Sequence, residues 1–274
     1  MMSNPEIGKT IKAAGRDTNY LEEGSGAPIL LLHGSGPGVT GYANWRLTIP
    51  ALSADFRVLA PDAMGFGYTE RLEGDVYTLD NWVAHTIGFM DALDIEKASF
   101  LGNSFGGALT IAIASRYPER VDRMALMGAA GLVFDLTESL DKVWGYEPSP
   151  GYMGEMMREC FAYDKSIIGD DLVQSRYEAS VRPGYHESYS AMFPAPRQRH
   201  VAALCTPEDK IAALTNRTLL VHGREDLVIP LQSSIRYHHL IKHSELHVFG
   251  ECGHWTQIEQ KDRFNTLVRN FFLS

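Results

Sequence analysis

The sequence predicts an α/β fold: a mostly parallel central sheet flanked by helices, with a helical insertion. Short apolar segments alternate with helical patterns along most of the chain, which is typical of folds built from parallel strands. Most of these segments are continuously apolar, as expected for strands that are buried on both faces. One long stretch, residues 135–210, breaks the alternation and predicts the insertion.

The strands can be placed by their composition and by the residues that end them. Residues 9–13 and 19–23 flank a turn at Gly15 and predict an opening hairpin. Six apolar segments follow, and each stops at glycine or at Pro-Asp, which favour turns. They are residues 28–32, 57–60, 98–101, 124–127, 218–221 and 246–249. Helical patterns cover residues 79–93, 108–117, 231–241 and 258–272.

Residues 135–210 contain no β pattern and are rich in Met, Tyr, Trp and Phe. A structureless loop of this length is implausible inside a compact domain, so we expect a helical cap inserted between two strands of the core. The predicted organisation is a core formed by residues 1–134 and 211–274, with the cap at residues 135–210.

Composition excludes several classes of protein. The net charge of −9 over 274 residues weighs against nucleic acid or an anionic membrane as a partner. The three cysteines form no CxxC pair and no disulfide framework. His239 and His243 have a metal-like spacing but lack the glutamate of H-E-x-x-H, so we expect no metal and no cofactor. Without an apolar leader or an 18-residue apolar run, the expected location is the cytoplasm.

The strongest chemical motif is Gly102-Asn103-Ser104-Phe105-Gly106, which lies between a predicted strand and a predicted helix. A tight strand-to-helix turn needs small residues two before and two after the serine. Ser104 would then stand at a helix N-terminus, where the backbone N–H of Phe105 can donate to a reacting oxygen. The alternative is a glycine-rich turn with a helix-capping serine. Its position favours a nucleophile in an α/β-hydrolase fold.

A serine hydroxyl needs a base to take its proton. His254 follows the last predicted strand, in a loop that can reach Ser104. In this fold the acid that orients the base lies between serine and histidine in the chain. Asp226 follows the strand at 218–221 and fits that order, with Glu225 as the neighbouring competitor. The sequence therefore predicts a triad of Ser104, Asp226 and His254.

The second oxyanion donor is expected in the glycine-rich loop HGSGPG at residues 33–38, after the third strand. Glycine lets a backbone approach a ligand closely. The loop lacks the Gly-Lys-Ser/Thr of a phosphate loop and the G-x-G-x-x-G of a dinucleotide site. We expect the N–H of Ser35 to act beside that of Phe105, with Gly36 as the alternative.

Nearly end to end, the sequence resembles the meta-cleavage product hydrolases, the C–C bond hydrolases of aromatic degradation. The resembling segments are LLLHGSGPGVTGYANW, APDAMGFGYTER, LGNSFGGALTIAIASRYPERV, VWGYEPS, RPGYHESYSAMFPAPRQR, VHGREDLVIP and GECGHWTQIEQ. The cap is most similar to the branch that acts on ring-fission products of monocyclic catechols, such as 2-hydroxymuconate semialdehyde and its alkyl derivatives. The resemblance implies a homo-oligomer and leaves the C6 substituent open.

The resemblance also implies a mechanism and an anionic dienoate substrate. The enzyme would hydrolyse the C5–C6 bond of a 2-hydroxy-6-oxohexa-2,4-dienoate. His254 would handle the proton that ketonises the dienol, and Ser104 would then attack the C6 carbonyl. Water would release the acyl enzyme as a carboxylic acid, with 2-hydroxypenta-2,4-dienoate as the other product.

Further site residues follow from the resemblance. Asn44 and Asn103 match positions that bind the dienoate end of the substrate. Arg182, in Arg-Pro-Gly, matches an arginine that pairs with the substrate carboxylate, a contact suited to a guanidinium. Trp255 would form a wall of the pocket. The remaining residues expected to shape the pocket or approach the substrate are Gly34, Gly36, Trp144, Ala130 and Val228. Some relatives have glycine at the position of Ser35, so the sequence leaves open which backbone N–H is the second oxyanion donor.

An esterase or lactonase with the same triad is the alternative enzyme. Asn44, Asn103, Arg182 and Trp255 discriminate between the two, because a simple ester would not need all four. A ligand receptor on the same scaffold is disfavoured because the triad and the glycine loop are complete. A dehalogenase is disfavoured because serine, and not aspartate, is the expected nucleophile.

Overall fold

The computed structural model describes residues 4–274, which contain an eight-stranded sheet in the order β1-β2-β4-β3-β5-β6-β7-β8. The hairpin of β1 and β2 joins the sheet by antiparallel pairing, and all other neighbouring strands are parallel. The strands are β1 (Lys9–Ala13), β2 (Arg16–Glu23), β3 (Pro28–Leu32), β4 (Arg57–Pro61), β5 (Ala98–Asn103), β6 (Val121–Met127), β7 (Thr218–Gly223) and β8 (Ser244–Phe249). The predicted mostly parallel sheet is confirmed.

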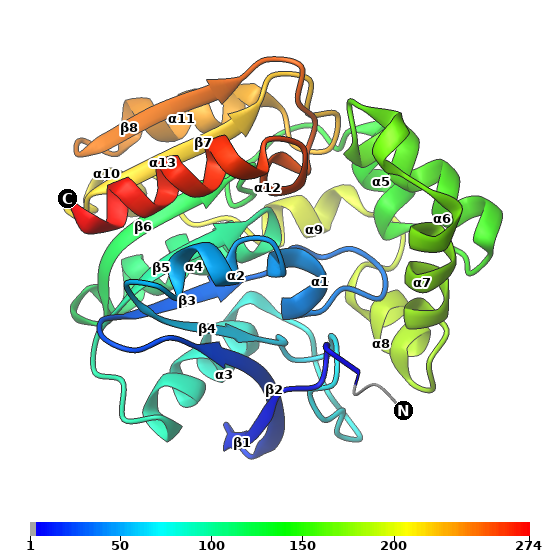
Figure 1. The fold of residues 1–274 in the computed structure, drawn as a ribbon, viewed down its shortest axis with the longest axis horizontal. Helices are drawn as coiled ribbons and strands as arrows, with labels where there is room; N and C mark the ends of the chain where they lie inside the picture. The colour runs from blue at the N-terminus through cyan, green and yellow to red at the C-terminus, as the bar shows by residue number, and fades with distance from the viewer. Residues whose placement is uncertain (1–3) are drawn as a thin grey trace.

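Helices cover both faces of the sheet (Figure 1). Those of the core are α1 (Gly41–Trp45), α2 (Ile49–Leu52), α3 (Leu79–Ala92), α4 (Phe105–Arg116), η1 (Pro118–Arg120), α11 (Leu231–Leu240), α12 (Thr256–Glu259) and α13 (Lys261–Leu273). The short helices α1 and α2 were not predicted. The single helix expected at 258–272 is two helices, because the backbone of Gln260 has φ −115° and ψ 32° and interrupts it.

The apolar run of β3 illustrates why this fold needs continuously hydrophobic strands. Leu30 and Leu32 belong to a buried cluster that includes Phe89 of α3 and side chains of α4. Ile29 and Leu31 point to the opposite face and belong to a second cluster, which includes Phe264 of α13. Since successive side chains alternate between faces and both faces are covered, each position of the strand must be apolar.

Between β6 and β7 the described chain forms helices and no strand. They are α5 (Glu138–Trp144), α6 (Pro150–Met156), the π-helix η2 (Met157–Phe161), η3 (Lys165–Ile167), α7 (Asp170–Ser180), α8 (Tyr185–Met192), α9 (Gln198–Ala203) and α10 (Glu208–Ala212). Figure 1 shows α5 to α8 together beside one end of the sheet, and we call the segment from α5 to α8 the cap. Helix α10 packs on α4 and α11 of the core. The boundaries at 134/135 and 210/211 stay a prediction. None of the helices in residues 4–274 has the length and hydropathy to cross a membrane.

Because two histidines are buried, we predict that the stability of the fold depends on pH. Burial lowers the pKa of His33 and of His85 to about 4, below the ordinary 6.5. As the pH falls from about 6.5 towards 4, the unfolded chain takes up protons that the folded chain excludes, so the free energy of unfolding should fall. Each such proton contributes a slope of about 1.4 kcal/mol per pH unit.

The variant His85→Gln removes one of these two titrating groups, so comparison with the wild type gives the contribution of His85. We expect its free energy of unfolding, measured by urea titration at several pH values, to fall less steeply between pH 6.5 and 4 than that of the wild type. Burial raises the pKa of Asp62 to about 6, which gives an opposing slope. That contribution is present in both proteins and cancels in the comparison. Equal slopes would contradict the prediction.

Candidate active site

The turn between β5 and α4 holds Ser104 in an unusual backbone conformation. Its φ is 53° and its ψ is −112°, in a region that non-glycine residues rarely adopt. A Cβ on Gly102 would lie 2.5 Å from the carbonyl oxygen of Gly106, and a Cβ on Gly106 would collide with the carbonyl of Leu32. Both glycines are therefore required by close packing around the turn. This is the physical basis of the spacing seen in the sequence.

A buried carboxylate orients His254. Asp226 lies in the loop after β7 and His254 in the loop after β8, and His254 Nδ1–H donates to Asp226 Oδ2 at 2.7 Å. The other carboxylate oxygen of Asp226 accepts the backbone N–H groups of Val228 at 2.8 Å and Ile229 at 3.0 Å. His222 Nε2 lies 3.3 Å from Asp226 Oδ2. His222 belongs to β7 and stands four residues before Asp226 in the chain.

These contacts determine the charge of Asp226. Burial acts to raise the pKa of its carboxyl, but His254 and His222 outweigh burial and hold that pKa well below its usual range. The carboxylate stays ionised at neutral pH and can only accept, so it keeps the His254 proton on Nδ1 and leaves Nε2 as the basic nitrogen. Ser104 and His254 line the same pocket. No hydrogen bond joins them in residues 4–274, and such bonds often tighten only when substrate binds.

Two backbone N–H groups are available beside Ser104. Phe105 is the first residue of α4, where helical N–H groups lack partners within the helix. Ser35 follows β3 and lines the pocket. Within residues 4–274, neither N–H has a hydrogen-bond partner. The side chain of Phe105 is buried against Trp82, so only its backbone can reach a ligand.

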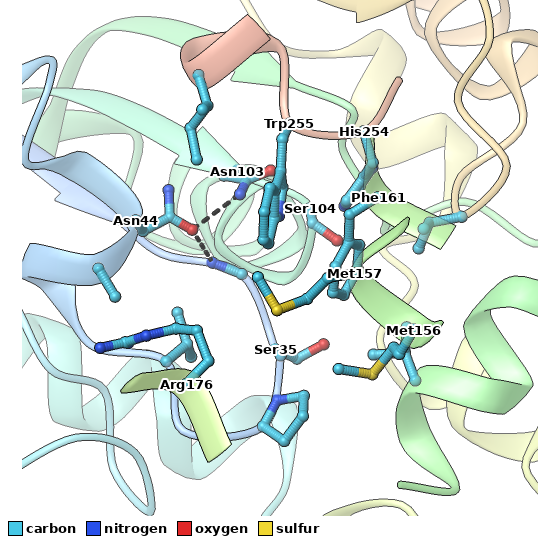
Figure 2. Close-up of a pocket in the computed structure, with 18 of the residues that line it drawn as sticks. Ser35, Asn44, Asn103, Ser104, Met156, Met157, Phe161, Arg176, His254 and Trp255 are labelled. Carbon is cyan, nitrogen blue, oxygen red and sulfur yellow. Dashed lines mark hydrogen bonds between the residues drawn. The ribbon is translucent and has the colours of Figure 1, made fainter. Parts of the chain in front are cut away.

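The pocket has two chemically different ends. Figure 2 shows Asn44 and Arg176 on one side of Ser104, and His254, Phe161 and Met156 on the other. The polar part of the lining also includes Arg46, Asn103 and Gln257. Further apolar residues of the lining are Leu140, Val143, Met153, Met157, Leu172 and Val228. A ligand with an anionic end and an apolar end fits this division.

The structure brings most of the predicted site residues to this pocket. Those in its lining are Gly34, Ser35, Gly36, Asn44, Asn103, Ser104, Val228, His254 and Trp255. Asp226 lies behind His254. Arg182, Trp144 and Ala130 are not in the lining, and each has another set of contacts.

Arg182 lies away from the pocket, contrary to its expected place. Its Nη1 donates to Glu6 Oε2 at 3.0 Å, and its guanidinium lies 4.8 Å from the ring centroid of Tyr68. Arg176 of α7, six residues earlier, lines the pocket instead and also donates to Glu6. Leu172 and Arg176 are four residues apart, on one face of a helix, and both line the pocket. That spacing is the signal in the sequence that could have identified Arg176.

Trp144 and Ala130 support the site from behind its lining. The indole N–H of Trp144 donates to Ser35 Oγ at 3.1 Å, and its ring stacks on Phe193 at 4.3 Å between centroids. The N–H of Ala130 donates to the carbonyl of Ser104 at 3.1 Å. Both residues were expected to shape the pocket directly. In the structure neither residue is in the lining, and each is hydrogen-bonded to a residue that is.

The fold and the site define an α/β-hydrolase with a serine at the strand-to-helix turn. A family model described as "alpha/beta hydrolase fold" matches residues 27–261. The chain is 53% identical to the 2-hydroxymuconate semialdehyde hydrolase of Pseudomonas sp. (strain CF600), over 98% of this chain and 95% of that protein. It is 52% identical to the 2-hydroxy-6-oxo-2,4-heptadienoate hydrolase of Pseudomonas putida F1, over 98% of this chain and 97% of that protein.

Solved structures agree with these similarities. A variant of the meta-cleavage product hydrolase of Pseudomonas fluorescens IP01, complexed with acetates, matches with a TM-score of 0.97 and 60% identity, covering 98% of both chains. The 2-hydroxy-6-oxo-6-phenylhexa-2,4-dienoate hydrolase of Rhodococcus sp. strain RHA1 matches with a TM-score of 0.90 and 31% identity, covering 98% of this chain and 99% of that one. The protein belongs to the meta-cleavage product hydrolases of the α/β-hydrolase family.

Proposed function

We propose that this protein hydrolyses the C5–C6 bond of a 2-hydroxy-6-oxohexa-2,4-dienoate that carries an apolar C6 substituent. The products are 2-hydroxypenta-2,4-dienoate and a carboxylic acid. The observation that carries the proposal is the position of Ser104 between a polar end of the pocket with Arg176 and an apolar end with Met156 and Phe161. A dienoate with its carboxylate at the polar end presents its C6 carbonyl to the serine.

The polar end contains unpaired groups that suit the dienoate. Asn103 Nδ2 donates to Asn44 Oδ1 at 2.9 Å, and the N–H of Gly34 donates to the same oxygen at 3.1 Å. Asn44 Nδ2 and Asn103 Oδ1 are buried without a partner in the described chain. Buried unpaired groups cost about 1–3 kcal/mol each, so a ligand that pairs them is favoured. A carboxylate oxygen of the dienoate would accept from Asn44 Nδ2, and the neighbouring 2-hydroxyl would donate to Asn103 Oδ1.

Arg176 is the cation that we assign to the substrate carboxylate. Its guanidinium lines the pocket on the same side of Ser104 as Asn44 (Figure 2). Arg46 lines the pocket as well and adds a second positive charge. A planar guanidinium can hold a carboxylate with two hydrogen bonds, which fixes the orientation of the substrate as well as its affinity.

The triad then performs a ketonisation followed by two nucleophilic attacks, and His254 transfers the protons. His254 Nε2 moves a proton from the 2-hydroxyl to C5, which converts the dienol to its keto form. Ser104 Oγ attacks C6 while His254 takes the proton of the serine hydroxyl. The oxyanion that forms on C6 accepts hydrogen bonds from the N–H groups of Ser35 and Phe105. The C5–C6 electron pair leaves into the conjugated ketone, giving a dienolate that takes up a proton. Water, activated by His254, hydrolyses the acyl enzyme.

The expected outcome is checked by a spectrophotometric assay with three substrates. We expect 2-hydroxy-6-oxohepta-2,4-dienoate to be bleached with a kcat/KM at least about 100-fold above that for p-nitrophenyl acetate, because the ester cannot use the polar end of the pocket. Preference for the 6-phenyl analogue would support the same reaction but show that the preferred substrate has a larger C6 substituent. Ester turnover without bleaching of either dienoate would contradict the C–C reaction and favour an esterase.

A further inference from the structure

The loop that carries His254 is bound to the cap through its backbone. The carbonyl of Phe161, the last residue of η2, accepts the N–H of His254 at 2.8 Å and the N–H of Trp255 at 3.2 Å. The rings of Phe161 and Trp255 stack with 5.0 Å between centroids. The base and the residue after it are therefore tied to one residue of the cap.

One carboxylate joins the same two segments from the other side. Glu259 of α12 accepts the N–H of Gly253 through Oε1 at 2.8 Å. Its Oε2 accepts the N–H groups of Tyr163 at 2.8 Å and Asp164 at 2.9 Å, both in the cap. Three successive N–H groups of the loop, from Gly253 to Trp255, thus bind either the cap or the carboxylate that holds the cap.

The close contact is built into the loop. A Cβ on Gly253 would lie 2.5 Å from the carbonyl oxygen of Phe161 and 2.9 Å from the nitrogen of Tyr163. Glycine directly before His254 is needed because the cap passes at this distance. Burial raises the pKa of the Glu259 carboxyl, and none of the salt bridges of residues 4–274 includes it. Its charge is met by backbone N–H groups, which is not the environment of a surface ion-pair residue.

We propose that Glu259 is a positioning residue that holds cap residues 161–164 and the loop at 253–255 as one unit and thereby places His254 relative to Ser104. The assignment rests on the proposed roles of Ser104 and His254. Displacement of the cap segment shifts the base, so full activation of Ser104 requires the cap segment to be docked. Glu259 does not line the pocket and does not contact substrate.

Glu259→Gln tests the proposal. A glutamine offers one acceptor oxygen, and its NH₂ faces N–H donors, so it cannot hold both segments. We expect kcat for the dienoate to fall about 10- to 100-fold with KM changed less than about threefold, because displacement of a catalytic group by about 1 Å slows chemistry rather than binding. The rate at which a phosphonofluoridate inactivates Ser104 should fall in parallel, since that reaction needs only the serine and its base.

The inactivation assay separates failure of this proposal from failure of the proposed function. If the wild type does not cleave dienoates but Glu259→Gln slows phosphonylation, the positioning role stands and the substrate is wrong. If phosphonylation and kcat both match the wild type, the positioning role is wrong.

Two control variants identify the cause of the loss. Glu225 Oε2 accepts the N–H of Cys252 at 3.0 Å in the same loop but makes no bond to the cap. Asp164 accepts the N–H of Ser166 with its side chain, while its own N–H binds Glu259. We expect Asp164→Asn to stay within about twofold of the wild type. A loss in Glu225→Gln equal to that in Glu259→Gln would overturn coupling to the cap, because loop anchoring alone would then explain both.

Hydrogen exchange of the wild type tests the proposal even if the variant fails to fold. The amides of residues 163, 164 and 253 share one carboxylate, so they should open together and show similar protection. Rapid exchange in the cap segment beside full protection at residue 253 would contradict a single unit.

Discussion

Ser104→Ala is expected to lower kcat for the dienoate by about 10⁴- to 10⁶-fold, because the members of a triad act as a unit. The nucleophile is lost, while Asp226, His254 and the polar end of the pocket remain. The variant should therefore still bind the dienoate with a dissociation constant near that of the wild type. Stopped-flow absorbance should show loss of the yellow dienol form without release of 2-hydroxypenta-2,4-dienoate, since ketonisation needs His254 and not the serine.

The matched control is Ser35→Ala, which removes a hydroxyl from the same pocket but keeps the backbone N–H that we assign to the oxyanion. Its kcat should stay within about tenfold of the wild type, far from the loss expected for an essential nucleophile. If Ser104→Ala itself lost less than about tenfold, Ser104 could not be the nucleophile.

The core of the fold was predictable because its signals are local. Each parallel strand is a short apolar run that stops at a turn-forming residue, and strand position follows directly from that pattern. The turn at Ser104 was predictable for the same reason, since the collisions that require Gly102 and Gly106 occur within a few residues. Strand ends were less certain. Val121 extends β6 because it pairs with Ala98 across the sheet, a contact that is not visible in β6 alone.

The support of Asp226 was only partly predictable. Chain order identified the carboxylate, but its position beside His222 depends on how the loop after β7 folds back on its own strand. Similarly, Trp144 was expected at the pocket, and the sequence around it could not reveal that it lies behind Ser35. An aromatic side chain in a cap packs against core atoms in either case, so the layer in which it lies is a tertiary property.

The arginine that we propose for the substrate carboxylate shows the same limit most clearly. Arg176 lies on α7, while Arg182 follows the end of that helix, and both donate to Glu6 near the N-terminus. A motif around Arg182 indicates the neighbourhood of the site but not which arginine faces it. The pairing of both arginines with Glu6 spans most of the chain, so no local pattern reports which of the two guanidinium groups also reaches the pocket.

Arg176→Gln should lower kcat/KM for the dienoate by about 10²- to 10³-fold, mainly through KM, because removing one partner of a buried charge pair costs about 2–5 kcal/mol. Arg182→Gln is the matched control: it removes the same charge from the same Glu6, but outside the pocket, and should change kcat/KM less than about threefold. Turnover of p-nitrophenyl acetate should be nearly unchanged in both variants, because this ester has no carboxylate to bind.

The ester reports whether the cap and the triad stay intact when a bond to Glu6 is lost. A fall in ester turnover in Arg176→Gln would mean that the variant damages the structure and not only the carboxylate site. If Arg182→Gln lost the dienoate activity while Arg176→Gln kept it, the arginine expected from the sequence would bind the substrate after all. The cap would then have to rearrange on binding, because in this structure Arg182 is turned towards Glu6 and Tyr68.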